Sequence, residues 1–165
     1  MYIEEKYWGN YIGGTDDSLL LLEYLIDKQK TEISLSEIFA DTGLDKLNWD
    51  FHKTEPTLVF KGRGVALIEG VENELYYAID VVTDLAALML ECSVNGSVSV
   101  GKLRGLGDET VVRITFTEEE KNAMNKALSD FVKAPLTYDL HEMVPDESML
   151  EMAQDCENLR KELCG

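Results

Sequence analysis

The sequence predicts an α+β protein that forms one domain over residues 1–165, with helices packed on a mainly antiparallel sheet of about five strands. Three observations lead to this prediction. Apolar residues with helical spacing occur near both ends and in the middle of the chain, and short β-rich segments lie between them. The length of 165 residues suits a single core, and the chain has only three prolines and no glycine-rich linker.

Two helices are predicted in the N-terminal part of the chain. The run Thr15-Asp16-Asp17-Ser18 consists of N-cap residue types, and its acids suit the positive end of a helix over residues 19–26. We therefore interpret the adjacent carboxylates of Asp16 and Asp17 as helix-capping groups. A second, short helix is expected from Ser34, because Glu37 follows three residues later as in a capping box.

The most apolar helix is predicted over residues 74–91. Apolar side chains lie almost all round it, which is typical of a central helix. The exception is one stripe, formed by Asp80, Asp84, Ala87 and Glu91 at spacings of four, three and four residues. The stripe has two readings, either the single solvent-facing side of the helix or the lining of a binding surface.

Four or five strands are predicted between the helices. Residues 57–60 and 65–68 are β-rich, and residues 61–64 between them resemble a hairpin turn. Residues 97–100 form a short alternating segment. Residues 110–117 alternate more clearly, with every second side chain apolar.

Two helices are predicted in the C-terminal part. Thr117 and Glu120 form a capping box for a helix that ends at Pro135. Ser148 and Glu151 form a further box at the start of the last helix, which presents apolar side chains at core spacing.

The charge of the chain limits its partners. With 32 acidic and 15 basic residues, the formal net charge is −17. A field of this sign repels phosphate backbones and anionic membrane surfaces, so we expect no direct nucleic-acid or membrane partner. It attracts basic proteins and speeds their encounter.

The three cysteines, Cys92, Cys156 and Cys164, favour a reducing compartment over a disulfide framework, because their number is odd and they lie in or beside apolar helical patterns. The first six residues carry acids where a signal peptide has bases. We therefore expect a cytoplasmic protein.

Catalytic and metal-binding patterns give no positive indication. His52 and His141 are the only histidines, and neither has a partner at metal-ligand spacing. The sequence lacks the Gly-x-Ser-x-Gly and phosphate-loop patterns. We therefore predict no catalytic residue, no metal and no cofactor, and expect a protein that is not an enzyme.

Three stretches carry a resemblance to a known family. They are residues 9–18 before the first helix, residues 34–39, and residues 77–86 with the sequence Tyr-Ala-Ile-Asp-Val-Val-Thr-Asp-Leu-Ala. Together they resemble the CdiI-type immunity proteins of contact-dependent growth inhibition systems, over about residues 8–92.

This resemblance implies a cytoplasmic inhibitor that binds the C-terminal toxin domain of a cognate CdiA effector. In the most similar branch the toxin is a metal-dependent DNase, and it donates a β-hairpin to the sheet of the immunity protein, which is β-augmentation. A nuclease has basic surface, which an acidic inhibitor complements. The predicted partner-binding residues are the aromatic anchors Trp8, Tyr76 and Tyr77 and the charge partners Glu72, Asp80 and Asp84.

Three alternative functions remain open from the sequence. The first is an acidic DNA-mimic inhibitor of a nucleic-acid enzyme, which would need carboxylates in rows at phosphate-like spacing. The second is a small metal-dependent enzyme that uses Asp80 and Asp84. The third is a structural subunit of a larger assembly, which would show as stable self-association. The identity of the toxin, the docking edge and the oligomeric state do not follow from the sequence.

Overall fold

The structure is a computed structural model that describes residues 1–60 and 74–165. Within these ranges it contains α1 (Tyr2–Lys6), α2 (Asp16–Asp27), α3 (Leu35–Thr42), α4 (Ala78–Asn95), α5 (Val100–Arg104), α6 (Glu118–Lys133) and α7 (Asp146–Cys164). Short 3₁₀ helices are η1 (Leu44–Leu47), η2 (Pro135–Thr137) and η3 (Asp139–Glu142). The strands are β1 (Trp8–Asn10), β2 (Ile12–Gly13), β3 (Glu32–Ser34) and β4 (Arg113–Thr115).

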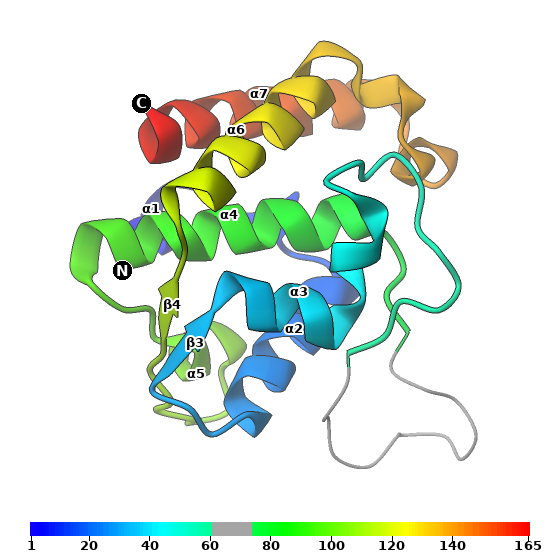
Figure 1. Cartoon of the computed structure of the whole chain (residues 1–165). Coiled ribbons are helices and arrows are strands. Elements are labelled where there is room, and N and C mark those ends of the chain that lie inside the picture. Colours follow the sequence, from blue (N-terminus) through cyan, green and yellow to red (C-terminus); the bar gives the residue numbers. More distant parts are fainter. Residues whose placement is uncertain (61–73) are drawn as a thin grey trace.

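The predicted fold class is wrong. In the described residues the strands form two sheets of two strands each, β1 with β2 and β3 with β4, and both pairs are parallel. Helices make up most of the structure, and β3 and β4 lie to one side of them (Figure 1). A mainly antiparallel sheet of about five strands is therefore not the framework of this protein.

The predicted strand at 110–117 is confirmed in part, because it contains β4, which pairs with β3. The predicted strands at 57–60 and 97–100 fail, because their apolar residues pack into the core without forming ladders. Val59 makes a single antiparallel bridge with Glu74, and Val98 makes one with Val112. Leu58 on the first of these segments is buried nonetheless. β-propensity indicates a side chain that fits a half-buried surface, and it does not by itself supply a pairing strand. The predicted hairpin turn at 61–64 and the strand at 65–68 lie outside the described residues.

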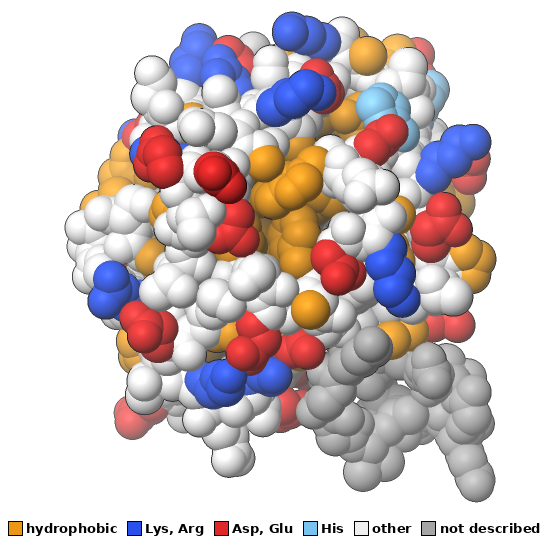
Figure 2. Space-filling view, in the orientation of Figure 1, with side chains coloured by type: hydrophobic (Ala, Val, Ile, Leu, Met, Phe, Trp, Pro, Cys, Tyr) orange, Lys and Arg blue, Asp and Glu red, His pale blue; other side chains and the backbone are white. Residues whose placement is uncertain are grey.

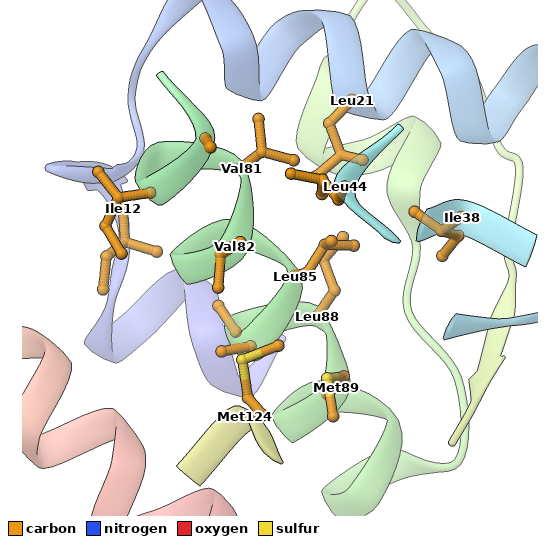
Figure 3. Close-up of a cluster of buried hydrophobic side chains, with 14 of the residues drawn as sticks. Ile12, Leu21, Ile38, Leu44, Val81, Val82, Leu85, Leu88, Met89 and Met124 are labelled. Atoms are coloured by element: carbon orange, nitrogen blue, oxygen red, sulfur yellow. The ribbon is translucent and has the colours of Figure 1, made fainter. Parts of the chain in front are cut away.

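The central helix is confirmed and is the axis of the fold. All side chains from Ala78 to Cys92 are buried. In Figure 1, α6 and α7 lie above α4, and α2 and α3 lie below it. Figure 3 shows Val81, Val82, Leu85 and Leu88 of this helix among side chains from the surrounding elements. A helix that is apolar on every side is stable only in such a position.

Helix starts follow the capping signals in three of four cases. The Thr15 hydroxyl accepts from the Ser18 backbone N–H at 3.1 Å, and Thr117 forms a reciprocal box with Glu120. The Ser34 hydroxyl accepts from the Glu37 N–H at 3.1 Å. The predicted capping box of Ser148 and Glu151 is wrong, because α7 begins before it, at Asp146, directly after Pro145. Proline fixes an extended cap conformation and lacks an N–H, so it starts a helix without a side-chain cap.

The first and last helices are joined by side chains. Glu162 of α7 accepts hydrogen bonds from the hydroxyl groups of Tyr2 and Tyr7, and its Oε1 lies 2.9 Å from the Lys6 Nζ. Glu91 of α4 also contacts this region, since its carboxylate accepts from the Tyr2 and Ile3 N–H groups. Residues at opposite ends of the sequence therefore form one packed unit around α4.

Candidate partner-binding surface

The stripe on α4 is not a solvent face. Asp84 is fully buried, and Asp80 and Glu91 are 3% and 1% exposed. The stripe faces inward because α1, α2 and α7 all pack against α4 and leave it no free side. Buried carboxylates require hydrogen bonds, cations or protonation, so the partners of each one decide its role.

Asp84 is fully engaged inside the protein. One of its oxygens accepts from the Gly13 N–H at 2.8 Å, and the other accepts from the Ser18 hydroxyl at 2.6 Å. Burial raises the pKa of Asp84 well above its ordinary value, although these two hydrogen bonds act in the opposite direction. The side chain thus fixes the start of α2 to α4.

The sequence predicts that Asp17 is a capping group of α2, but in the structure its carboxylate binds elsewhere. Asp17 is 2% exposed, and its two oxygens accept from the N–H groups of Tyr76 and Tyr77 at 2.9 and 2.8 Å. Burial raises its pKa despite these bonds. Asp17 therefore holds the segment that leads into α4, and it places Tyr76 at the surface.

Asp80 has a different environment. The pKa of Asp80 is raised to about 7, mainly by burial and to a lesser extent by repulsion from Asp17 and Asp139. No hydrogen bond from the described residues counteracts this increase. The carboxylates of Asp17, Asp80, Asp139 and Glu142 all act on the hydroxyl of Tyr77, whose pKa is raised first by burial and then by their charges. The N-terminal end of α4 is thus a region of concentrated negative charge.

The predicted aromatic anchors differ in exposure. Tyr76 is 61% exposed and Tyr77 is half-buried. Trp8 is also half-buried, and its indole covers Gly13 so closely that a Cβ there would lie 2.2 Å from Trp8 Cδ2. Gly13 also has a φ of +79°, so glycine is required at this contact. Glu72 lies outside the described residues.

An open cleft lies beside the acidic end of α4. It has a volume of about 690 Å³ and is lined by three segments, residues 52–54, 136–139 and 141–142. Thr54 joins these segments to α4, because its N–H donates to Asp139 Oδ2 at 2.8 Å and its hydroxyl accepts from the Ala78 N–H at 2.8 Å. The cleft is thus built on a fixed connection to α4.

A second, more apolar groove adjoins this cleft. Its volume is about 300 Å³, and it runs between α6 and the segment after η1, with Trp49, Ala123 and Ala127 among its lining residues. Figure 2 shows a hollow with a hydrophobic floor in this region, with acidic side chains around it. His52 and Tyr138 line both hollows, and their rings stack at 4.0 Å.

Sequence reasoning did not identify Trp49, His52, Tyr138 or Asp139 as residues with a shared role. His52 has its Nδ1 2.5 Å from Asp50 Oδ1. No local motif connects these residues, because Trp49 and His52 follow η1, whereas Tyr138 and Asp139 lie far later in the chain, at η2 and η3. Such a surface can be found only from the folded arrangement.

Residues 1–60 and 74–165 contain no group of three or more histidine, cysteine or acidic side chains that could hold a metal ion. No helix in these ranges is long and apolar enough to cross a membrane.

The fold and surface therefore define an acidic, mostly helical protein with a hollowed face and no assembled metal site among its described residues. The chain belongs to the Imm68 family, immunity protein 68, whose model matches residues 2–163. Comparisons with curated proteins and with solved structures found no match. The predicted class of immunity protein is thus confirmed, and a toxin is the kind of partner that this class implies.

Proposed function

We propose that this protein acts in the cytoplasm of the producing cell, where it binds the C-terminal toxin domain of a cognate CdiA effector and blocks it without performing a reaction. The proposal includes a nuclease as the toxin. The observation that carries it is membership of an immunity-protein family over nearly the whole chain. The net charge of −17 supports a basic partner, as a nuclease must be to hold phosphate.

The proposed mode of binding uses side-chain contacts at the surface. β-Augmentation would extend a mainly antiparallel sheet, and the prediction of that sheet was wrong. Tyr76 and Tyr77 are proposed contacts together with the acidic end of α4, and Asp80 contributes its charge from below the surface. Trp8 stays in the proposal as a partner contact, and so does Glu72, which lies outside the described residues. Asp84 acts indirectly, because it is buried and fixes the start of α2.

A metal-dependent enzyme built on Asp80 and Asp84 is not favoured. Both oxygens of Asp84 are already used by Gly13 and Ser18, so a cation would have to displace these bonds. The DNA-mimic alternative needs surface rows of acids, whereas Asp17, Asp80 and Asp84 are buried in the core.

Calorimetric titration against the candidate CdiA toxin domain, at low and at high salt, tests this function. We expect nanomolar one-to-one binding that weakens severalfold at high salt, because charge steering is screened. A parallel assay should show that the toxin loses its nuclease activity at equimolar inhibitor. Absence of binding to every candidate toxin domain at micromolar concentration would contradict the proposal.

A further inference from the structure

The surface that contains both hollows indicates where a partner can bind, which the family assignment does not. We name it the His52–Tyr138 face, and it consists of the acidic cleft lined by residues 52–54, 136–139 and 141–142 and the apolar groove beside Trp49. The rings of His52 and the buried Tyr138 are stacked, and both residues line both hollows. Phe131 supports Tyr138 from the core, edge to face at 4.9 Å. A single partner can therefore contact both hollows at once.

The acidic cleft has spare acceptor capacity. Asp139 Oδ2 accepts from Thr54, but Asp139 Oδ1 is buried without a hydrogen-bond partner, the only buried side-chain oxygen or nitrogen of this kind in the described residues. A buried acceptor without a donor is unfavourable, so a ligand that supplies a donor is favoured. Glu142 is exposed at the same cleft. The basic side chains of the lining are the exposed Lys53 and the two histidines, His52 and His141.

The groove on the other side of these rings is built on strained backbone. Asn48 and Trp49 both have positive φ, 53° and 63°. For a bulky residue such as tryptophan this conformation is an energetically unfavourable outlier. The surrounding core holds it in place, since the indole packs on Phe39 at 4.7 Å and on Phe51 at 6.0 Å. The conformation presents the edge of a half-buried tryptophan as one wall of an apolar groove.

The chemistry of the two hollows selects one kind of occupant. The charge of −17 disfavours a free phosphate ligand, and it also disfavours a second copy of this chain. The side chain that satisfies an unpaired buried carboxylate oxygen beside Glu142 is a lysine or an arginine. Charged anchors next to an apolar groove are the arrangement found at protein interfaces.

We propose that the His52–Tyr138 face is the toxin-docking surface, where a basic side chain of the toxin enters the acidic cleft toward Asp139 and Glu142 while an apolar side chain fills the groove beside Trp49. This inference rests on the proposed function and specifies where and how the toxin binds. Binding brings a donor toward the carboxylates of Asp139 and Glu142 and covers His52.

Titration of a catalytically inactive toxin domain against four proteins tests this surface. They are the wild type, the charge variant Asp139→Asn/Glu142→Gln, the groove variant Ala123→Gln, and the control Glu5→Gln/Glu109→Gln. The charge variant and the control both remove two carboxylates, so their general effect on steering is equal. Ala123 lies in α6, where glutamine is a good helix former that fills the groove without changing charge.

We expect the charge variant and the groove variant each to weaken toxin binding by at least about tenfold, mainly through faster dissociation, while the control changes it by less than about threefold. Thermal unfolding of each variant within a few degrees of wild type shows that the fold is retained. If Asp139→Asn destabilises the protein, Glu142→Lys alone serves as the charge variant.

The outcomes separate the two proposals. If the wild type binds the toxin and all variants bind as the control does, the docking surface is overturned and the proposed function stands. If the wild type binds no toxin, both are overturned. Self-association of the free protein that Ala123→Gln abolishes would assign the groove to a second copy of the chain and would also overturn the inference.

Discussion

The buried and half-buried carboxylates near α4 fall into two groups that differ in how their oxygens are used. Asp17, Asp84 and Glu91 accept hydrogen bonds from distant segments with both oxygens. Asp80 and the half-buried Asp139 keep unused acceptor capacity near the acidic end of α4, since Asp139 accepts from the Thr54 N–H with Oδ2 only. The first group joins parts of the chain, whereas the second concentrates charge next to an open cleft.

This difference shows that burial alone does not indicate the role of an acidic side chain. A carboxylate that satisfies backbone donors replaces secondary-structure bonds at helix ends and loops, so its loss should destabilise the fold. A carboxylate without such donors carries a cost in the free protein that a basic partner can remove. Three substitutions test this division.

The largest effect is expected at Asp84. Asp84→Ala leaves the Gly13 N–H and the Ser18 hydroxyl without their acceptor and opens a small cavity, so the free energy of unfolding should fall by about 3–4 kcal/mol. Urea denaturation followed by circular dichroism at pH 7 measures it. The control Asp84→Asn keeps the shape and one acceptor, and should cost about 1 kcal/mol or less. Equal losses in both variants would contradict the division.

An effect of opposite sign is expected at Asp80. Its folded-state pKa of about 7 lies above the ordinary value of 3.8, so the folded protein holds this proton more tightly than the unfolded chain. Stability from this group is therefore present below pH 4 and is lost as the pH rises through 7. Asp80→Asn removes this titration and should raise the free energy of unfolding at pH 8 by about 2 kcal/mol. This is half of the about 4 kcal/mol that a pKa difference of about three units can contribute.

The pH dependence provides the control for that variant. Because folded wild-type Asp80 is protonated at pH 4.5, while the unfolded chain has only begun to gain from its ionisation, the difference between Asp80→Asn and wild type should be smallest there and grow until the pH passes 7. Denaturant titrations at four pH values measure this trend. A stabilisation that is independent of pH would show that Asp80 does not titrate as described.

The smallest effect is expected at Glu91, which joins α1 to α4. Glu91→Gln keeps one acceptor but places an amide group opposite a backbone N–H, so we expect a loss of about 1 kcal/mol. Hydrogen exchange should detect it as faster exchange in residues 2–6 only, with α4 protected as in wild type. Uniform acceleration over the whole chain would show that α1 does not open as a separate unit.

The helices could be predicted from the sequence because their signals are local. Thr15, Ser34 and Thr117 bond to N–H groups within three residues, and the all-round apolar pattern of residues 78–92 requires a central position. The strands could not be predicted in the same way. Val59 and Val98 have β-propensity, but the packing of α2, α4 and α6 takes up the core, and only single bridges form.

The candidate surface was predicted only in part. Spacing identified Asp80 and Asp84 as one stripe, and the aromatic residues 76 and 77 were selected beside it. Spacing could not reveal that α1 and α7 cover this stripe, so its solvent-facing reading was wrong. Asp139 carries no motif, and its importance comes from contacts with Thr54, 85 positions earlier in the chain.

The contact of Glu162 with Tyr2, Lys6 and Tyr7 has a consequence for biosynthesis. Tyr2, Lys6 and Tyr7 are synthesised well before Glu162, so this contact can form only after α7 has been made. A nascent chain that lacks α7 keeps the contact of α1 with Glu91, but its Tyr2, Lys6 and Tyr7 side chains lack Glu162 and one side of α4 is uncovered. In a cell that makes both inhibitor and toxin, protection would then depend on how many complete chains are already stored.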